Sequence, residues 1–247
     1  MTYILIIPIF NEEQNIINLI NVLSKSFLIN DENCIKILLV NDGSDDNSEE
    51  IIKSEIKDHR KIVSLNHKKN MGYGAAIITG INYSKNLSNY SVFSDSDLTN
   101  PIDDIKKMTV LMDRNVDYIQ ANRYTENTNN IQPHRKFIGV AGNFLCRFFM
   151  NMNIGDYTNG FRAIKTDLLV NFENEENGFA YLIEEINKVS KKAKSYAEVP
   201  YILSVRNDLH SKSKFTYSIF LPTNFLAFLI FLSLMSQVVK VPLINFT

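Results

Sequence analysis

Val92-Phe93-Ser94-Asp95-Ser96-Asp97-Leu98-Thr99-Asn100-Pro101 is the stretch that decides the fold, because an apolar run stops there at two carboxylates and a turn follows. A short strand that ends in Asp-x-Asp presents both acids at the edge of a sheet. Open α/β sheets bind ligands beyond the carboxyl ends of their strands, so the acids are placed to hold a divalent cation against a phosphate-bearing substrate. Carboxylate oxygens suit Mg²⁺ or Mn²⁺. Taken alone, the pair is more typical of an Asp-rich turn that caps the following helix.

Two earlier predicted strands also end in polar turns. Residues 3–8 are continuously apolar, as expected for a strand buried on both faces, and Asn11 and Glu12 follow. Residues 35–40 form a second predicted strand, apolar except at Lys36, that leads into Asn41-Asp42-Gly43-Ser44. Since the carboxyl ends of parallel strands meet at one edge of a sheet, we expect these side chains to lie along the same edge as the paired acids.

The order of the predicted elements sets the fold class. Strand and helix patterns alternate up to Ala121, which predicts an α/β fold with a mixed, mostly parallel sheet flanked by helices. The expected strands span 3–8, 35–40, 61–65, 90–94 and 117–121, and helices begin near residues 11, 48, 74 and 101. Beyond a polar loop, we expect a Phe-rich helix at 136–153, a helix at 179–191 and a strand at 195–205.

Composition narrows the function classes. The 247 residues carry a formal net charge of −1, so the whole molecule is not an electrostatic trap for nucleic acid. The two cysteines, Cys34 and Cys146, have no paired spacing and are expected to be reduced and buried. The four histidines are too scattered for a zinc site and are assigned no role: His59, His67, His134 and His210.

The two ends of the chain differ in character. The N-terminus lacks a signal-peptide pattern and begins directly with a strand. Residues 215–239 contain no charge, and the apolar run from Pro222 to Val239 covers 18 residues, close to the roughly 20 that a spanning helix needs. We therefore expect one domain at 1–214 and a membrane-associated tail at 215–247. Spanning, interfacial and domain-packed tails all fit this pattern.

On its motifs the chain resembles the family-2 glycosyltransferases of the Rossmann-like GT-A fold. Within that family it is similar to the dolichol- or polyprenyl-phosphate mannose and glucose synthases. The resemblance covers residues 3–214 and rests on Pro8-Ile9-Phe10-Asn11-Glu12, Asn41-Asp42-Gly43-Ser44, Asn70-Met71-Gly72-Tyr73-Gly74, Asp95-Ser96-Asp97, Asp156 through Arg162, Glu198-Val199-Pro200, and Arg206 with Ser211-Lys212.

The resemblance implies a role for each matched position. The positions that it places at the nucleotide are Pro8, Phe10, Glu12, Asp42, Asp95 and Ser96. It places a Mg²⁺ or Mn²⁺ ion at Asp95 and Asp97, with Asp97 the more direct ligand. The catalytic set is completed by cations around the diphosphate and the acceptor phosphate, namely Arg123, Arg135, Arg206 and Lys212. Thr99 departs from the glutamine common in mannose synthases, Leu209 from a usual glycine and Asn41 from an aspartate. Thr99 resembles the glucosyl-transferring relatives, whereas Asn159-Gly160-Phe161-Arg162 resembles the mannosyl ones, so the donor sugar stays open.

The implied reaction moves a hexose, mannose or glucose, from a GDP- or UDP-sugar to dolichyl or another polyprenyl phosphate, with inversion. The partners are this donor, the lipid acceptor and a membrane, without nucleic acid, and the catalytic domain faces the cytoplasm. Because the acceptor phosphate is already anionic, no general base is required. One alternative is transfer to a saccharide or protein hydroxyl with Asp156 as base. Another is a non-catalytic membrane protein that binds nucleotide-sugar. Arg123 and Arg135 could instead be surface charges, and Glu185 is expected to brace its helix.

Overall fold

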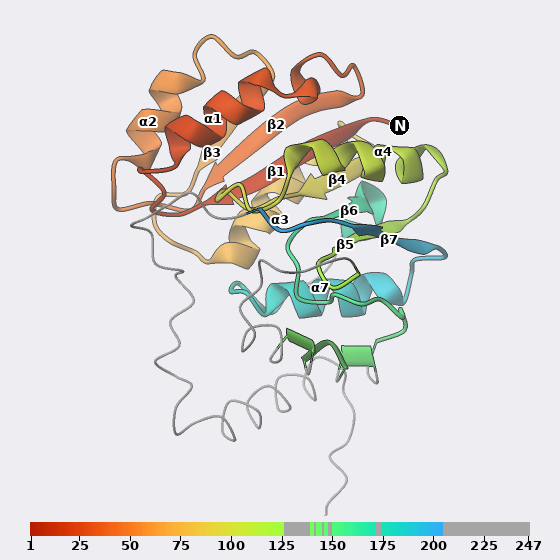
Figure 1. The fold of residues 1–247 in the computed structure, drawn as a ribbon. Coiled ribbons are helices and arrows are strands. Elements are labelled where there is room, and N and C mark those ends of the chain that lie inside the picture. The colour runs from red at the N-terminus through yellow and green to blue at the C-terminus, as the bar shows by residue number, and fades with distance from the viewer. Residues whose placement is uncertain (126–138, 141, 145, 148–149, 171–173, 205–247) are drawn as a thin grey trace, which may run out of the picture. The chain divides into compact units, whose positions relative to one another are not determined.

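Seven strands form one sheet in the computed structural model, which describes residues 1–125, 139–140, 142–144, 146–147, 150–170 and 174–204. The strands are β1 (Tyr3–Ile9), β2 (Cys34–Asn41), β3 (Ile62–Asn66), β4 (Tyr90–Phe93), β5 (Tyr118–Asn122), β6 (Arg162–Lys165) and β7 (Tyr196–Pro200). Their order across the sheet is β3-β2-β1-β4-β6-β5-β7 (Figure 1). The first five strand predictions are confirmed within a few residues, and the expected strand at 195–205 is observed as β7.

The sheet is mixed, as expected. Strands β1 to β4 pair in parallel, and β5 pairs in parallel with β7. Strand β6 runs antiparallel to both of its neighbours, β4 and β5. The sequence pattern did not predict β6, because it has only four residues and begins with an arginine. Its insertion places the segment just before Arg162 against the end of β4, where the paired acids follow.

The helices are α1 (Ile16–Lys25), η1 (Phe27–Ile29), α2 (Ser48–Glu55), α3 (Tyr73–Ser84), η2 (Ile102–Asp104), α4 (Ile105–Asp113), α6 (Thr166–Leu169) and α7 (Tyr181–Ser190). The helix expected from Asn11 begins five residues later. Asn11 instead adopts a left-handed conformation with φ of 51°, which the short polar side chain of asparagine tolerates. The helix expected at 179–191 is confirmed as α7. Of the Phe-rich helix expected at 136–153, residues 139–140, 142–144 and 146–147 are helical, residues 150–153 are not, and the remaining positions lie outside the described residues.

Helices cover both faces of the sheet. Alternate residues of β1 point to opposite faces. Tyr3, Leu5 and Ile7 belong to a core cluster with apolar residues of α1 and α4. On the other face Ile6 meets α3 so closely that a Cβ on Gly80 would lie 2.4 Å from its side chain. Figure 1 shows α1 and α4 on one side of the sheet and α3 on the other. The predicted two-sided covering is confirmed.

The expected cysteine state is also observed, because Cys34 and Cys146 are both buried and unpaired. The hydrophobic tail at 215–247 and the domain boundary at 214 lie outside the described residues. Within residues 1–204, as far as they are described, the structure contains no helix long and apolar enough to cross a membrane.

Candidate active site at the carboxyl edge of the sheet

The turns after β1 and β2 lie at the same edge of the sheet, as predicted, and hydrogen bonds join them. The Asn11 amide donates to Ser44 Oγ at 2.9 Å, and the Asp45 amide donates to Asn11 Oδ1 at 2.8 Å. The Glu12 amide donates to Ser48 Oγ at 2.9 Å. These contacts fix the left-handed turn at Asn11 and hold the two turns as one unit.

Four of the six positions expected to bind nucleotide lie on or beside these turns, and the other two, Asp95 and Ser96, follow β4. Pro8 and Phe10, both half-buried, end the first strand and begin its turn. Glu12 is buried, and its Oε2 accepts a hydrogen bond of 2.7 Å from Asn15 Nδ2. Asp42 follows β2 directly, and its backbone amide donates to the Ile9 carbonyl at 2.8 Å. The structure therefore brings the four positions to one edge, as predicted, and their nucleotide-binding role stays a prediction.

Asp42 is held by a network that the sequence did not reveal. Its Oδ1 accepts from His67 Nδ1 at 2.6 Å and from the Met71 amide at 3.0 Å. Its Oδ2 accepts from the Gly72 amide at 2.8 Å. His67 was assigned no role, although its place directly after β3 puts it at the same edge as Asp42 and could have indicated this contact.

The paired acids follow β4 at the centre of the edge. Asp97 Oδ1 accepts hydrogen bonds from the Thr99 amide at 3.0 Å and from Thr99 Oγ1 at 2.7 Å, so Thr99 fixes the orientation of this carboxylate. Asp95 Oδ2 accepts from Asn100 Nδ2 at 3.2 Å. Ser96, between the acids, is buried.

The electrostatics of the pair fit a cation. Burial and the negative charge of Asp97 raise the pKa of Asp95, and the Asn100 amide and nearby arginines oppose this shift. A cation relieves this repulsion, and carboxylate oxygens are the donors that Mg²⁺ and Mn²⁺ prefer. In the described part of the chain no group of three or more acidic, histidine or cysteine side chains could hold a metal. Two carboxylates fit a Mg²⁺ ion that takes its remaining ligands from water and substrate phosphates.

Gly160 closes the site beside Asp95. A Cβ placed on Gly160 would lie 2.9 Å from Asp95 Oδ1 and 3.1 Å from the Tyr73 hydroxyl oxygen. Tyr73 begins α3, and its ring stacks on Phe179 with centroids 4.9 Å apart. The backbone at residue 160 therefore approaches the acid as closely as a residue without a side chain allows.

Arg123, one of the predicted phosphate-binding cations, forms a bidentate pair with Asp156. Its Nε lies 2.7 Å from Asp156 Oδ2, and a terminal nitrogen lies 2.9 Å from Oδ1. Asp156 is fully buried, and the Arg123 side chain is 23% exposed. The reading of Arg123 as a solvated surface charge is therefore wrong. Glu198 supports the loop that carries Asp156, because its Oε1 accepts from the Gly155 amide at 2.7 Å.

A second arginine pair lies behind the site. Arg162 in β6 bonds Glu185 in α7 at 2.5 and 2.7 Å, and both side chains are buried. Arg162 also donates to the Gly160 carbonyl at 2.7 Å and lies 4.2 Å from the centre of the Phe93 ring. Glu185 was expected to cap or brace its own helix, and it instead joins α7 to β6 through Arg162, which also holds the carbonyl of the glycine that faces Asp95. The other predicted cations, Arg135, Arg206 and Lys212, lie outside the described residues.

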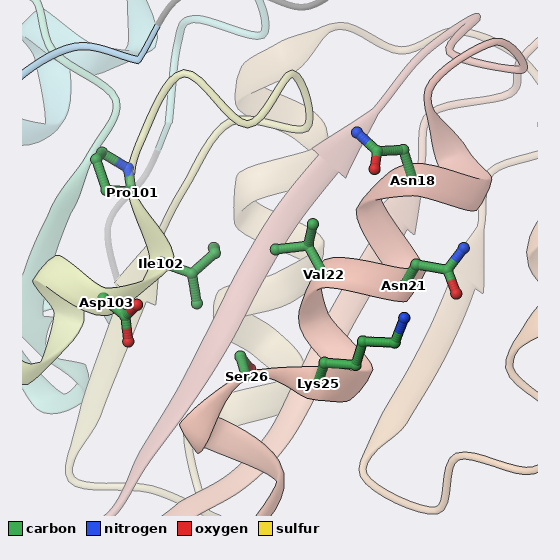
Figure 2. A pocket seen from close by; sticks show the side chains of 8 residues that line it. All are labelled: Asn18, Asn21, Val22, Lys25, Ser26, Pro101, Ile102 and Asp103. Carbon is green, nitrogen blue, oxygen red and sulfur yellow. The ribbon is translucent and has the colours of Figure 1, made fainter.

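A groove of about 500 Å³ separates α1 from η2 (Figure 2). Asn18, Asn21 and Lys25 line it from α1, and Pro101 and Asp103 line it from the other side. None of the predicted site residues that the structure describes lines this groove, so it is distinct from the described part of the carboxyl-edge site.

Comparison with known proteins shows which family the chain belongs to. A family model described as "Glycosyl transferase family 2" matches residues 4–172. A dolichyl-phosphate beta-glucosyltransferase of Trichomonas vaginalis is 29% identical over 170 residues, which cover 64% of this chain and 50% of that protein. A UDP-N-acetylglucosamine–dolichyl-phosphate N-acetylglucosaminyltransferase of Methanococcus voltae is 28% identical over 67% of this chain and 70% of that protein.

A solved structure shares the fold. Glucosyl-3-phosphoglycerate synthase from Mycobacterium tuberculosis, in complex with Mn²⁺, uridine diphosphate and glucosyl-3-phosphoglycerate, superimposes with a TM-score of 0.63. It is 16% identical, over 98% of this chain and 81% of that one. The chain spans half the length of the Trichomonas relative.

Proposed function

Because the chain belongs to glycosyl transferase family 2, we propose that it transfers a hexose, mannose or glucose, from a GDP- or UDP-sugar to dolichyl or another polyprenyl phosphate. The observation that carries this proposal is the pair Asp95 and Asp97 at the carboxyl end of β4, with Asp97 oriented by Thr99. The names of the two relatives, which both act on dolichyl phosphate, support the acceptor class.

Each part of the site has a task in this reaction. Asp97 and Asp95 would hold the Mg²⁺ or Mn²⁺ ion, which supplies positive charge to the departing diphosphate. Arg123 adds a cation that Asp156 holds in a fixed orientation, and a guanidinium suits bidentate contacts with phosphate. Arg135, Arg206 and Lys212 complete the proposed cation set. Pro8, Phe10, Glu12 and Asp42 form the proposed nucleotide site.

The acceptor determines whether a general base is needed. A lipid phosphate oxygen is anionic at neutral pH, so the site has only to align it for in-line attack and to stabilise the leaving group. A single displacement inverts the anomeric carbon. A sugar or protein hydroxyl instead requires a base, and Asp156 is the candidate. Both of its oxygens already accept hydrogen bonds from Arg123, and it is fully buried, which argues against that role.

The test is transfer of radiolabelled sugar into the organic phase by the full chain, with polyprenyl phosphate and Mn²⁺ or Mg²⁺. UDP-glucose, UDP-N-acetylglucosamine and GDP-mannose form the donor panel. We expect one donor to label the lipid, and the label to vanish when lipid phosphate is omitted. Label that appears only with a saccharide acceptor would support the hydroxyl alternative. Nucleotide binding without transfer for every donor would support the non-catalytic one.

We also propose that the chain works at a membrane with its site toward the cytoplasm, because its acceptor is a lipid. The uncharged residues 215–239 and the basic segment before them support this location. Assaying the same transfer in membrane pellets after carbonate extraction, with and without residues 215–247, tests the role of the tail. Equal activity in the pellets of both forms would contradict a tail-dependent attachment.

A further inference from the structure

His67 and Asp42 form a buried pair at the proposed nucleotide site. His67 Nδ1 lies 2.6 Å from Asp42 Oδ1, and His67 Nε2 lies 2.8 Å from Thr79 Oγ1 in α3. The two paired side chains are 10% and 5% exposed. An ionised carboxylate only accepts hydrogen bonds, so the Nδ1 atom of His67 donates to Asp42. Thr79 holds the other side of the ring and thereby fixes the direction of that donor.

The hydrogen bonds of Asp42 divide unequally between its two oxygens. Oδ1 accepts from His67 and from the Met71 amide, whereas Oδ2 accepts from the Gly72 amide. A carboxylate oxygen offers about two acceptor sites. Counting the described residues alone, Oδ1 is therefore filled and Oδ2 keeps one acceptor site.

The surrounding backbone keeps Asp42 in this orientation. The His67 amide donates to the Asn41 carbonyl at 2.9 Å, which joins the segment after β3 to the end of β2. Gly43, with φ of 63°, packs so tightly that a Cβ there would lie 2.2 Å from the Lys69 carbonyl carbon. Rotating the Asp42 carboxylate so that Oδ1 becomes free would break the three hydrogen bonds that the carboxylate accepts from His67, Met71 and Gly72.

We propose that His67 is a positioning residue that makes the site selective for uridine over guanosine nucleotides. The inference rests on the proposed function, which includes Asp42 in the nucleotide site, and it further assigns Asp42 to the base of the donor. Uracil presents one imide N–H between two carbonyls, which a single acceptor site satisfies. Guanine presents two adjacent N–H groups that pair with both oxygens of a carboxylate. With Oδ1 filled, one guanine donor would be desolvated without a partner, and such a group reduces affinity.

Two substitutions at residue 67 separate positioning from packing. In His67→Asn the side-chain amide nitrogen takes a place near Nδ1, so it retains a donor to Asp42. In His67→Gln the amide nitrogen takes a place near Nε2, so it reaches Thr79 and leaves Oδ1 with one fewer donor. The Asn variant is the matched control, because both changes remove the ring.

The measurement is the Kd of UDP and of GDP for the full chain by titration calorimetry in Mn²⁺. We expect the wild type to bind UDP at least about tenfold more tightly than GDP. This ratio corresponds to the cost of roughly one guanine N–H group that is buried without an acceptor. His67→Asn should retain this ratio. His67→Gln should bind UDP more weakly and bring the two Kd values close together.

Several results would overturn the inference. One is GDP binding as tight as UDP binding in the wild type. Another is an unchanged ratio of the two Kd values in His67→Gln. A third is an equal loss of this ratio in His67→Gln and His67→Asn. Should His67→Gln not fold, Thr79→Val replaces it, because losing the ring's second anchor should narrow the ratio in the same direction. A wild type that binds neither nucleotide refutes the proposed function and this inference with it. A wild type that binds both equally refutes the inference alone.

Discussion

Gly160 shows at the scale of one residue how closely the site is built. Its Cα lies against Asp95 and Tyr73, and the Arg162 guanidinium holds its carbonyl. The sequence identified the motif around this glycine through its resemblance to a family. It did not reveal that the residue touches one of the paired acids, because contacts between residues 95 and 160 depend on the unpredicted strand β6.

Replacing Gly160 by alanine should impair transfer. The added methyl group would lie 2.9 Å from Asp95 Oδ1, so the carboxylate must move. A shift of ~1 Å in a site of this kind costs about 10²-fold in rate. The measurement is the transfer rate at saturating donor, with a thermal melt to verify folding. Gly178→Ala is the control, because a Cβ there meets no atom within 4 Å. Equal rates for the two variants would contradict the account.

Other residues of the site were partly visible in the sequence. The paired acids and Asp42 were predicted at the sheet edge, because apolar runs that end in acidic turns are a local pattern. The bidentate pairing of Arg123 with Asp156 was not predicted, because the two are separated by 33 positions in the sequence. The contact between His67 and Asp42 was also not predicted, although both residues directly follow predicted strands. Long-range pairing depends on topology, which single-residue patterns do not contain.

At the scale of elements, several of the strands that the sequence predicted are almost wholly buried. Strand β1 has six buried residues of seven, and β4 is buried throughout. Strand β6 was missed because its first residue is charged. Arg162 is tolerated there because Glu185 of α7 neutralises it inside the protein, and a buried charge needs such a partner. The sequence pattern of β6 alone cannot show that a residue of another element neutralises its buried charge.

Asp117 joins three elements at the opposite edge. Lys165 at the end of β6 lies 2.6 Å from Asp117 Oδ1, and the Lys194 amide before β7 donates to Oδ2 at 2.6 Å. Burial tends to raise the pKa of Asp117, but the Lys165 ammonium and the amides of Lys194 and Ser195 lower it below its usual range. The charged carboxylate therefore stabilises the folded state above the unfolded-state pKa, and this contribution is lost as the pH falls through the folded-state pKa.

Asp117→Asn should therefore lower the free energy of unfolding at pH 7, by about 1.5–3 kcal/mol for a hydrogen-bonded charge. The difference from the wild type should shrink below pH ~4, where the unfolded aspartate becomes protonated. Urea unfolding of the wild type and of Asp117→Asn, at pH 7 and at acidic pH, measures the difference in the free energy of unfolding and its dependence on pH. Asp103→Asn serves as control, since its side chain is 80% exposed and pairs only across the surface with Lys106. A difference that stays constant with pH would refute the ionic contribution.

At the scale of the whole molecule, the described residues of the candidate site lie along one edge of the sheet. The fold class, the two-sided covering by helices and the family were all predicted from the sequence, because alternating strands and helices constrain a parallel sheet strongly. The donor base and sugar were not, because they depend on a few side-chain contacts at that edge. The lipid acceptor that we propose would account for the uncharged stretch at 215–239.

The most direct test of the central claim is sugar transfer to polyprenyl phosphate by the wild type and by Asp97→Ala. Asp103→Ala is the matched control, because it removes an exposed acid six residues away. The account predicts that the wild type and Asp103→Ala label the lipid equally. Asp97→Ala should retain its melting temperature and lose at least ~10²-fold in rate, the magnitude that removing one charge-stabilising group costs. Undiminished transfer by Asp97→Ala would contradict the account.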